Sequence, residues 1–511
     1  MPSEVGRTGQ PVQRLHPLSL LFTVGQQARN LLLPGIVVLV FASGRGWGGE
    51  LWFMVLFFPA VIAALFHYWS YRYRFDAEEL VIREGIVFRN ERHIPYARIQ
   101  NVDLVQNPLH RMFDVAEVRL ETAGGDKPEA VMRVLSLEAV DHLRTRVFAG
   151  RRERAPLPTT DEDDAVAPVA GGADPSRLLH SLNAGDVVRF GLISNKGMVV
   201  VAAAVGALWQ LDLFDRWWES LSRDSVERLR SMLPSGGLLS GILLAVLAIV
   251  VLLILMRALS VLWAIGKFHG FRLTLRGEDL RAEHGLLTRV SKTIPRHRIQ
   301  VLSTRESFLH RRCGRVAVEV ETAGSTGQQS GSSSGRLWLA PLIRRERVAA
   351  LLREALPDVD LSAIGWMPVS PRTRRRLLRR AFYLVAIASV PAFWGLGPAG
   401  LTLPLALVPL AWINASLYVR HTAYALVPGA VVYRSGWWNR RLSVARFSKI
   451  QSLEQSASPF DRRYGMAALR VDTAGATRTG HSVDIPYLDT AVVNGLVDRL
   501  FAEAGRTAFR W

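Results

Sequence analysis

A threefold internal repeat constrains the fold of this chain more than any other feature of its sequence. The copies span Gly85–Gly124, Gly285–Gly324 and Gly436–Gly475, and they align without a gap. Each copy carries a glutamine at the same distance from its first glycine, and each ends in an acidic residue followed by Thr-Ala-Gly. Because spacing shared over such a length marks a duplicated unit, we expect three copies of one module.

The pattern inside each copy predicts antiparallel strands followed by a helix. Val118 and Leu120 alternate with charged residues, as in a strand with one buried face, and the pairs Val318–Val320 and Leu469–Val471 repeat this alternation. The opening glycine of each copy lies between two short apolar stretches, so we predict a tight turn with positive φ there. Apolar residues at helical spacing predict closing helices over Ser136–Ala149, Ile343–Leu356 and Leu488–Ala504.

Six apolar runs predict membrane-spanning helices, and two of them precede each copy. Hydrophobic residues make up 49% of the 511 residues, and a span requires about twenty apolar residues. The runs are Leu31–Ser43 (extended to Gly48), Leu51–Tyr71, Gly197–Phe214, Gly236–Ile265, Ala381–Gly397 and Ala399–Tyr418. The predicted fold class is therefore an α+β membrane protein, with six transmembrane helices in three hairpins. Each hairpin is followed by a β-rich module that one C-terminal helix caps.

These patterns divide the chain into predicted segments. Residues 151–176 form a disordered linker, because an acidic run is followed there by Ala, Pro and Gly. Arg177–Phe190 is predicted as an amphipathic helix on the membrane surface. The predicted segments are an N-terminal segment at 1–28, helix pairs at 29–71, 177–266 (with the surface helix) and 381–419, modules at 72–150, 267–357 and 420–505, linkers at 151–176 (disordered) and 358–380 (basic), and a tail at 506–511.

The charge distribution predicts the orientation in the membrane. The net charge is +19, and a chain this basic suits either nucleic acid or an anionic membrane surface. Arginine and lysine flank the apolar runs on the side of the modules, which favours the membrane and argues against a nucleic-acid partner. Both termini and all three modules are therefore expected in the cytoplasm, with the chain crossing the cell (inner) membrane several times.

The repeat motifs resemble a known family. The segment Ile94-Pro95-Tyr96-Ala97-Arg98-Ile99-Gln100, its counterpart Ile294–Gln300, the Glu-Thr-Ala-Gly ends and the start Arg14-Leu15-His16-Pro17 are similar to the bacterial PH-like, membrane-flanked domain proteins of the YdbS/YdbT-like group. The third copy departs from this pattern at Val444-Ala445-Arg446 and at Lys449. The resemblance implies a PH-like module, a strongly bent sheet of seven strands capped by one helix. It implies no catalytic activity, and some members of the family are linked to resistance against membrane-active peptides.

One repeated position and one basic cluster are the candidate contact sites. Arg98, Arg298 and Lys449 either bind an anionic headgroup or pair with the recurring carboxylates, and the second interpretation is favoured. Those carboxylates are Glu121, Glu321 and Asp472. The glutamines Gln100, Gln300 and Gln451 are interpreted as side chains that bond backbone groups at a strand bend.

The basic cluster consists of Arg372, Arg374, Arg375, Arg376, Arg379 and Arg380. Each arginine near an anionic membrane contributes about 1 kcal/mol of attraction, so the cluster is a candidate site for anionic lipid. The same cluster also works as a topology signal, and both roles are compatible.

No motif in the sequence predicts an enzyme. Phosphate-binding and metalloprotease motifs are missing, and no GxSxG motif is placed between a strand and a helix. The single cysteine and the scattered histidines lack the spacing of metal ligands. We therefore predict no catalytic residue, no metal and no cofactor. The predicted function is a non-catalytic multi-pass membrane scaffold or sensor, with a role in envelope stress or antimicrobial-peptide resistance as one hypothesis.

The alternative function is a transporter or a lipid-handling membrane protein. A proton-coupled pump is disfavoured, because the apolar runs contain no Glu or Lys, and their one Asp, Asp212, lies at the end of its run. The expected partners are the lipid bilayer with its anionic headgroups, and either a second copy or another membrane protein of the same family.

Overall fold

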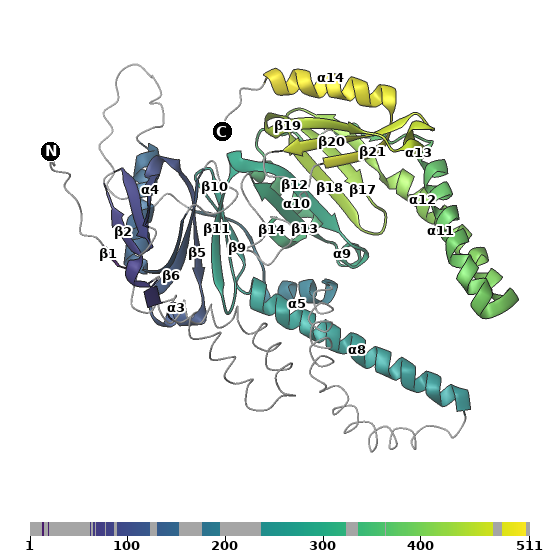
Figure 1. The fold of residues 1–511 in the computed structure, drawn as a ribbon, viewed down its shortest axis with the longest axis horizontal. Helices are drawn as coiled ribbons and strands as arrows, with labels where there is room; N and C mark the ends of the chain where they lie inside the picture. The colour runs from purple at the N-terminus through teal and green to yellow at the C-terminus, as the bar shows by residue number, and fades with distance from the viewer. Residues whose placement is uncertain are drawn as a thin grey trace. The chain divides into compact units, whose positions relative to one another are not determined.

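The computed structural model describes residues 13–14, 19, 62, 65–66, 68–76, 78–85, 89–122, 130–152, 176–194, 237–322, 336–362, 364–473 and 483–506. The chain divides into two compact units. Unit 1 contains Met1–Ala173, Leu182–Phe271 and Glu283–Thr293, and unit 2 contains Asp174–Ser181, Arg272–Ala282 and Ile294–Trp511. Both units combine β-sheets with helices, in agreement with the predicted α+β class (Figure 1).

All three repeats have the same order of elements: three leading strands, a 3₁₀ turn, a first trailing strand, a short helix, two more trailing strands and a closing helix. In repeat one these are β2 (Arg72–Phe75), β3 (Glu79–Glu84), β4 (Asn90–Pro95), η1 (Tyr96–Arg98), β5 (Ile99–Gln106), α3 (Pro108–Met112), β6 (Val115–Thr122), β7 (Ala130–Ser136) and α4 (Leu137–Arg152). In repeat two they are β9 (Arg272–Arg276), β10 (Asp279–His284), β11 (Arg289–Pro295), η2 (Arg296–Arg298), β12 (Ile299–Glu306), α9 (Phe308–Arg312), β13 (Arg315–Thr322), β14 (Leu337–Arg344) and α10 (Arg345–Ala355). In repeat three they are β16 (Ala423–Val427), β17 (Ala430–Ser435), β18 (Arg440–Arg446), η4 (Phe447–Lys449), β19 (Ile450–Ser456), α13 (Pro459–Arg462), β20 (Met466–Thr473), β21 (Val483–Asp489) and α14 (Thr490–Arg506).

Each repeat has one more strand, and it comes from the chain before the apolar helices. β1 (Gln13–Arg14) pairs with β2, β8 (Arg177–Ser181) pairs with β9, and β15 (Met367–Pro368) pairs with β16. The prediction of one surface helix from Arg177 was therefore wrong for its first part. Residues Arg177–Ser181 satisfy their backbone groups on β9, and helix α5 begins only at Ala184 and ends at Ile193. Each repeat thus has seven strands.

The trailing strands of one repeat pair with the leading strands of the next. β5 of repeat one is antiparallel to β11 of repeat two, with Gln106 opposite Arg289. β12 of repeat two is antiparallel to β18 of repeat three, with Glu306 opposite Arg440. We call these pairings joint one and joint two.

The sheets of each unit follow from these pairings. Unit 1 contains the strand orders β1-β2-β3-β4 and β7-β6-β5-β11. Unit 2 contains β10-β9-β8, then β14-β13-β12-β18-β17-β16-β15, and separately β19-β20-β21. Helix α14 covers the last of these sheets (Figure 1).

The predicted core register is confirmed in all three repeats. Val118, Leu120, Val318, Val320, Leu469 and Val471 are all 0% exposed. The predicted turns are confirmed as well, because Gly85, Gly285 and Gly436 have φ of 94°, 119° and 84°. The predicted closing helices correspond to α4, α10 and α14. The expected strand bend is a β-bulge at the repeated glutamine, between Ile99 and Asn101 and at the equivalent place in the other repeats.

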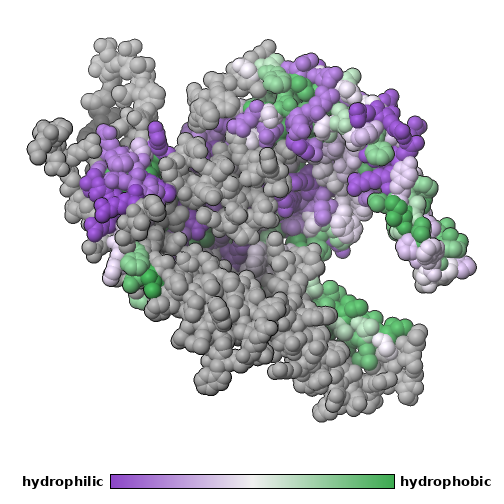
Figure 2. All heavy atoms as spheres, viewed as in Figure 1, coloured by the Kyte–Doolittle hydropathy of each residue, from purple (hydrophilic) through white to green (hydrophobic). Residues whose placement is uncertain are grey.

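Three described helices are long and apolar enough to cross a membrane, and they match the fourth, fifth and sixth predicted spans. They are Gly241–Phe268 in α8 (Gly237–Phe268), Thr373–Gly395 in α11 (Thr373–Leu396), and Gly397–His421, which comprises η3 (Gly397–Leu401) and α12 (Thr402–His421). Their surfaces are largely hydrophobic (Figure 2). The first and third predicted spans, most of the second, and nearly all of the predicted disordered linker lie outside the described residues.

Arg257 has a different role from the one its sequence position suggests. An arginine near the end of an apolar helix usually extends to the membrane surface. Here its Nη1 donates to the carbonyl oxygens of Leu192 and Ser194, at 3.0 and 3.3 Å, while Ser260 Oγ donates to Ser194 at 2.8 Å. Arg257 therefore satisfies the last carbonyls of α5 and fixes that helix to α8.

Candidate functional site

The arginine cluster forms the first turns of α11 rather than a linker, and repeat three anchors these turns. The backbone N–H of Ser370 donates to the Tyr487 carbonyl at 3.0 Å. Arg372 Nη1 donates to the Tyr464 carbonyl at 2.9 Å, and Arg376 Nε donates to Asp461 at 2.9 Å. The arginines are therefore held at a fixed place, where the apolar helix meets the PH-like module.

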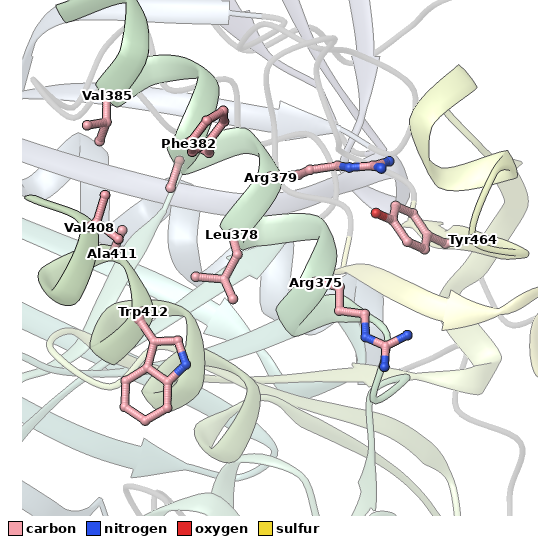
Figure 3. A pocket seen from close by; sticks show the side chains of 10 residues that line it. Arg375, Leu378, Arg379, Phe382, Val385, Val408, Ala411, Trp412 and Tyr464 are labelled. Atoms are coloured by element: carbon pink, nitrogen blue, oxygen red, sulfur yellow. The ribbon is translucent and has the colours of Figure 1, made fainter. Parts of the chain in front are cut away.

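A cleft of about 450 Å³ opens beside these turns. Its polar end is formed by Arg375, Arg379 and Tyr464, and its apolar wall comes from both membrane helices (Figure 3). The apolar residues are Leu378, Ala381, Phe382 and Val385 of α11, and Val408, Ala411 and Trp412 of α12. A cavity with two cations at one end and an apolar wall at the other suits an amphiphile with an anionic headgroup.

The arginines of the cluster differ in their contacts. Arg376 is half-buried and bound to Asp461, so it has a structural role. The Arg379 guanidinium lies 5.6 Å from the Tyr464 ring centre, in cation–π contact. Arg375 is exposed and makes no ion pair with any described residue. The same holds for Arg374 and Arg380, which lie outside the cleft. Two cations in the cleft therefore remain available for an anion.

The repeated cation position lies at a different place in the repeats. Arg98, Arg298 and Lys449 end the 3₁₀ turns η1, η2 and η4, between leading and trailing strands and not within the sheet. Arg98 is exposed, whereas Arg298 is buried. Burial lowers the pKa of Lys449, and the nearby Arg446 lowers it further. None of the three lines the cleft.

The sequence change in the third copy has a structural reason. Arg446 occupies the position of Pro95 and Pro295 and forms an ion pair with Asp358. Its Nη1 also donates to the Arg296 carbonyl at 2.9 Å. A proline has no side-chain donor for such a contact, so the arginine adds a polar link between repeat three and repeat two.

The recurring carboxylate of repeat two, Glu321, is bound by Arg336. Glu321 accepts a bond from Arg336 Nε at 2.6 Å, and Glu319 lies 3.3 Å from Arg305 and 3.5 Å from Arg336. Burial raises the pKa of Glu321, although Arg336 opposes this shift. The bulge glutamine Gln300 is also buried, but its Oε1 accepts no hydrogen bond from a described residue. This buried ion network beside joint two was not predicted from the sequence.

Two histidines act as helix caps, a role that sequence reasoning missed. The backbone N–H groups of Asn107 and Ser307 donate to His110 Nδ1 at 3.2 Å and His310 Nδ1 at 3.4 Å. Asp461 replaces the histidine in repeat three. Burial lowers the pKa of His310 to about 4, which keeps the ring neutral and able to accept. The signal was a polar N-cap with its partner three residues later.

Comparison with known families matches each of the three repeats. The profile of the family described as "Bacterial PH domain" matches residues 20–151, 233–357 and 381–504, which together exceed half of the chain. The chain belongs to the bacterial PH-domain family. The matched ranges begin after β1, β8 and β15, so the family description does not include the strand that precedes each helix pair.

One relative of this bacterial PH-domain chain is the UPF0699 transmembrane protein YdbT of Bacillus subtilis (strain 168). The two are 24% identical over 463 residues, which cover 88% of this chain and 90% of the relative. No solved structure matches the chain. Within the described residues, no group of three or more His, Cys, Asp or Glu side chains is arranged to hold a metal ion.

Proposed function

We propose that this protein is a non-catalytic membrane scaffold or sensor that presents three PH-like modules on the cytoplasmic side of the cell membrane. In this proposal six spans form three pairs, and the cleft at the base of α11 and α12 binds an anionic lipid. Family membership and the three apolar helices support a role at the membrane. The cleft supports the lipid, because its cations and its apolar wall fit the two halves of one molecule.

The observation that carries the lipid proposal is the position of Arg375 and Arg379. Both guanidinium groups lie at the polar end of the cleft, beside Tyr464 and next to the apolar wall (Figure 3). A general basic surface would attract any anionic membrane without selecting a lipid. A cleft with its own acyl-chain wall instead binds one lipid from the surrounding membrane.

We expect the double substitution Arg375→Gln and Arg379→Gln to reduce the retention of anionic phospholipid by about thirtyfold. Each lost contact between a guanidinium group and the headgroup removes about 1 kcal/mol, and the two losses combine to a factor of this size. The measurement is native mass spectrometry of the full-length chain after purification in mild detergent with equal amounts of phosphatidylglycerol and phosphatidylcholine.

The matched control is the double substitution Arg374→Gln and Arg380→Gln. It removes the same charge from the same helix, but neither residue lines the cleft. We expect this control to retain lipid as the unchanged chain does. Equal losses in both variants would show a diffuse basic surface, and full retention in both would refute the lipid proposal.

The proposed orientation can be tested with the chain's only cysteine. Cys313 is exposed directly after α9 in repeat two. A membrane-impermeant maleimide should leave Cys313 unlabelled in intact cells and label it after lysis. A Ser222→Cys, Cys313→Ser chain provides the opposite control, since residue 222 belongs to a predicted outer loop. Labelling of Cys313 in intact cells would contradict a cytoplasmic module.

A further inference from the structure

Of the strands that lie at sheet ends within the described part of the structure, two are of the types that form joints one and two. β4 is the last strand of its sheet in unit 1, and β19 is the last strand of its sheet in unit 2. By repeat position, β4 corresponds to β11 and β18, while β19 corresponds to β5 and β12. These are the two strand types that form joints one and two. We call β4 the head edge and β19 the tail edge.

The burial of equivalent residues differs sharply between a joint and an edge. Val301, Ser303 and Thr304 of β12 are buried in joint two. The equivalent residues Ser452, Glu454 and Gln455 of the tail edge are all exposed. The head edge is exposed over Asn90–His93. Both edges therefore present backbone donors and acceptors that a further strand can pair.

The register of the joints identifies residues that face each other across the two edges. In joint two, Ser303 is opposite Ser443, and their hydroxyl oxygens lie 3.4 Å apart. At the same position in joint one, Asp103 Oδ2 lies 3.8 Å from Lys292 Nζ. The repeat places Glu454 at this position on the tail edge and Arg92 on the head edge.

The two edges carry the same signs of charge as the equivalent strands of joint one, at the position of Asp103 and Lys292. An acidic residue lies on the trailing strand and a basic residue on the leading strand in both cases. Opposite charges directly across two strands favour pairing, whereas like charges oppose it. Charged residues can also serve only to keep an edge strand from pairing with other chains. Such residues would not need opposite charges at matching positions of the two edges.

A second contact, made by an arginine of the short helix, occurs in both joints, and the equivalent arginine of repeat three is exposed. In joint one, Arg111 Nη1 donates to the Leu286 carbonyl at 3.2 Å, and in joint two Arg311 Nη1 donates to the Trp438 carbonyl at 2.9 Å. Both arginines lie on the short helix of one repeat and bond the loop after the opening glycine of the next. The equivalent Arg462 on α13 is exposed, and its side chain makes no hydrogen bond to a described residue.

We propose that the tail edge of one molecule pairs with the head edge of a second copy in the register of joints one and two. Glu454 then faces Arg92 of the second copy, and Arg462 lies beside the head edge of that copy. Such a contact uses two different surfaces, so it assembles copies head to tail into a ring or a row. This assembly is independent of the lipid site and would extend the module array along the membrane.

Cysteine pairing tests the contact in full-length protein. Two chains with different tags, both carrying Cys313→Ser, are co-expressed, one with Arg92→Cys and the other with Glu454→Cys. Opposite positions on antiparallel strands are within disulfide distance. Oxidation in membranes should give a covalent dimer that carries both tags. Arg83→Cys on β3, exposed but one strand away from the edge, replaces Arg92→Cys in the control and should give none.

Charge reversal at Arg92 and Glu454 gives a second readout. The fold should tolerate these substitutions, because both residues are exposed. Arg92→Glu or Glu454→Arg alone should weaken self-association about tenfold, as like charges then face each other. The double variant should restore it. Failure of both the cross-link and the charge rescue would overturn the proposal. Two other results would also overturn it. One is a disulfide formed within a single chain that carries both Arg92→Cys and Glu454→Cys, and the other is a cross-link from either cysteine to a different protein.

Discussion

Val318→Asp should unfold repeat two. Val318 lies in the middle of β13, is 0% exposed, and stands opposite Thr304 on β12 and Ala340 on β14. A carboxyl group at this place loses its hydration without gaining a partner, and we expect a loss of about 4 kcal/mol in the free energy of unfolding. Because β12 also pairs with β18, the loss should extend across joint two.

Hydrogen exchange measured by mass spectrometry on the purified chain can localise this effect. Peptides from β12, β13, β14 and β18 should exchange faster in Val318→Asp than in the unchanged chain. Ala350→Asp is the matched control, because it introduces the same charge at an exposed place on α10. It should cost no more than about 1 kcal/mol. Unchanged protection of β13 in the Val318 variant would contradict the assigned core register.

Gly285→Ala should be the second most damaging of the substitutions considered. Gly285 has a φ of 119°, and an added Cβ would lie 1.9 Å from the Thr288 carbonyl oxygen. The alanine therefore meets both an unfavourable backbone region and a clash with backbone that cannot move aside cheaply. We expect a loss of roughly 3 kcal/mol, observed as a lower midpoint of thermal unfolding in detergent.

A second glycine provides a control that the repeats themselves suggest. Gly314 also has a positive φ, 60°, but nothing lies within 4 Å of an added Cβ. Repeat one has Asp114 at this position, with a φ of 50°. Gly314→Asp should therefore stay within about 1 kcal/mol of the unchanged chain. Similar losses for Gly285→Ala and Gly314→Asp would show that the clash at Thr288 is not the cause.

The predictions that the structure confirms rest on patterns among residues close together in the sequence. Alternation in Val118–Leu120 and its copies depends only on which face of a strand is buried, so the sequence specifies it directly. The opening glycines were identifiable because a tight turn with positive φ favours the same residue in every copy. The closing helices follow from apolar spacing in the same way.

Pairing between strands was not predictable from the same signals. The alternation in β5 shows that the strand is half-buried, but it does not show whether the neighbour is β4 or β11. Leu178, Leu179 and Leu182 have spacings that also suit a helix, and only the pairing of Arg177–Ser181 with β9 decides the outcome. Such choices depend on contacts between residues far apart in the sequence.

The candidate site also has one part that the sequence predicted and one part that it did not. Composition identified the arginine cluster, because many cations within a short segment are visible in any reading of the chain. The cleft was not predictable, because it requires Trp412 from α12 and Tyr464, which follows α13, to meet α11. Sequence reasoning also could not separate Arg376, which is bound to Asp461, from Arg375, which faces the cleft.

The pairing of each repeat with the next has a consequence for synthesis on the ribosome. Arg289 of β11 comes 289 − 106 = 183 positions after its partner, Gln106 of β5. At roughly 5–20 residues per second, β5 is made about 10 to 40 seconds before the strand it pairs with. The nascent chain must keep that edge from aggregating during this interval. A message truncated between repeats would therefore yield a product with a permanently unpaired strand, a natural substrate for chaperones and proteases.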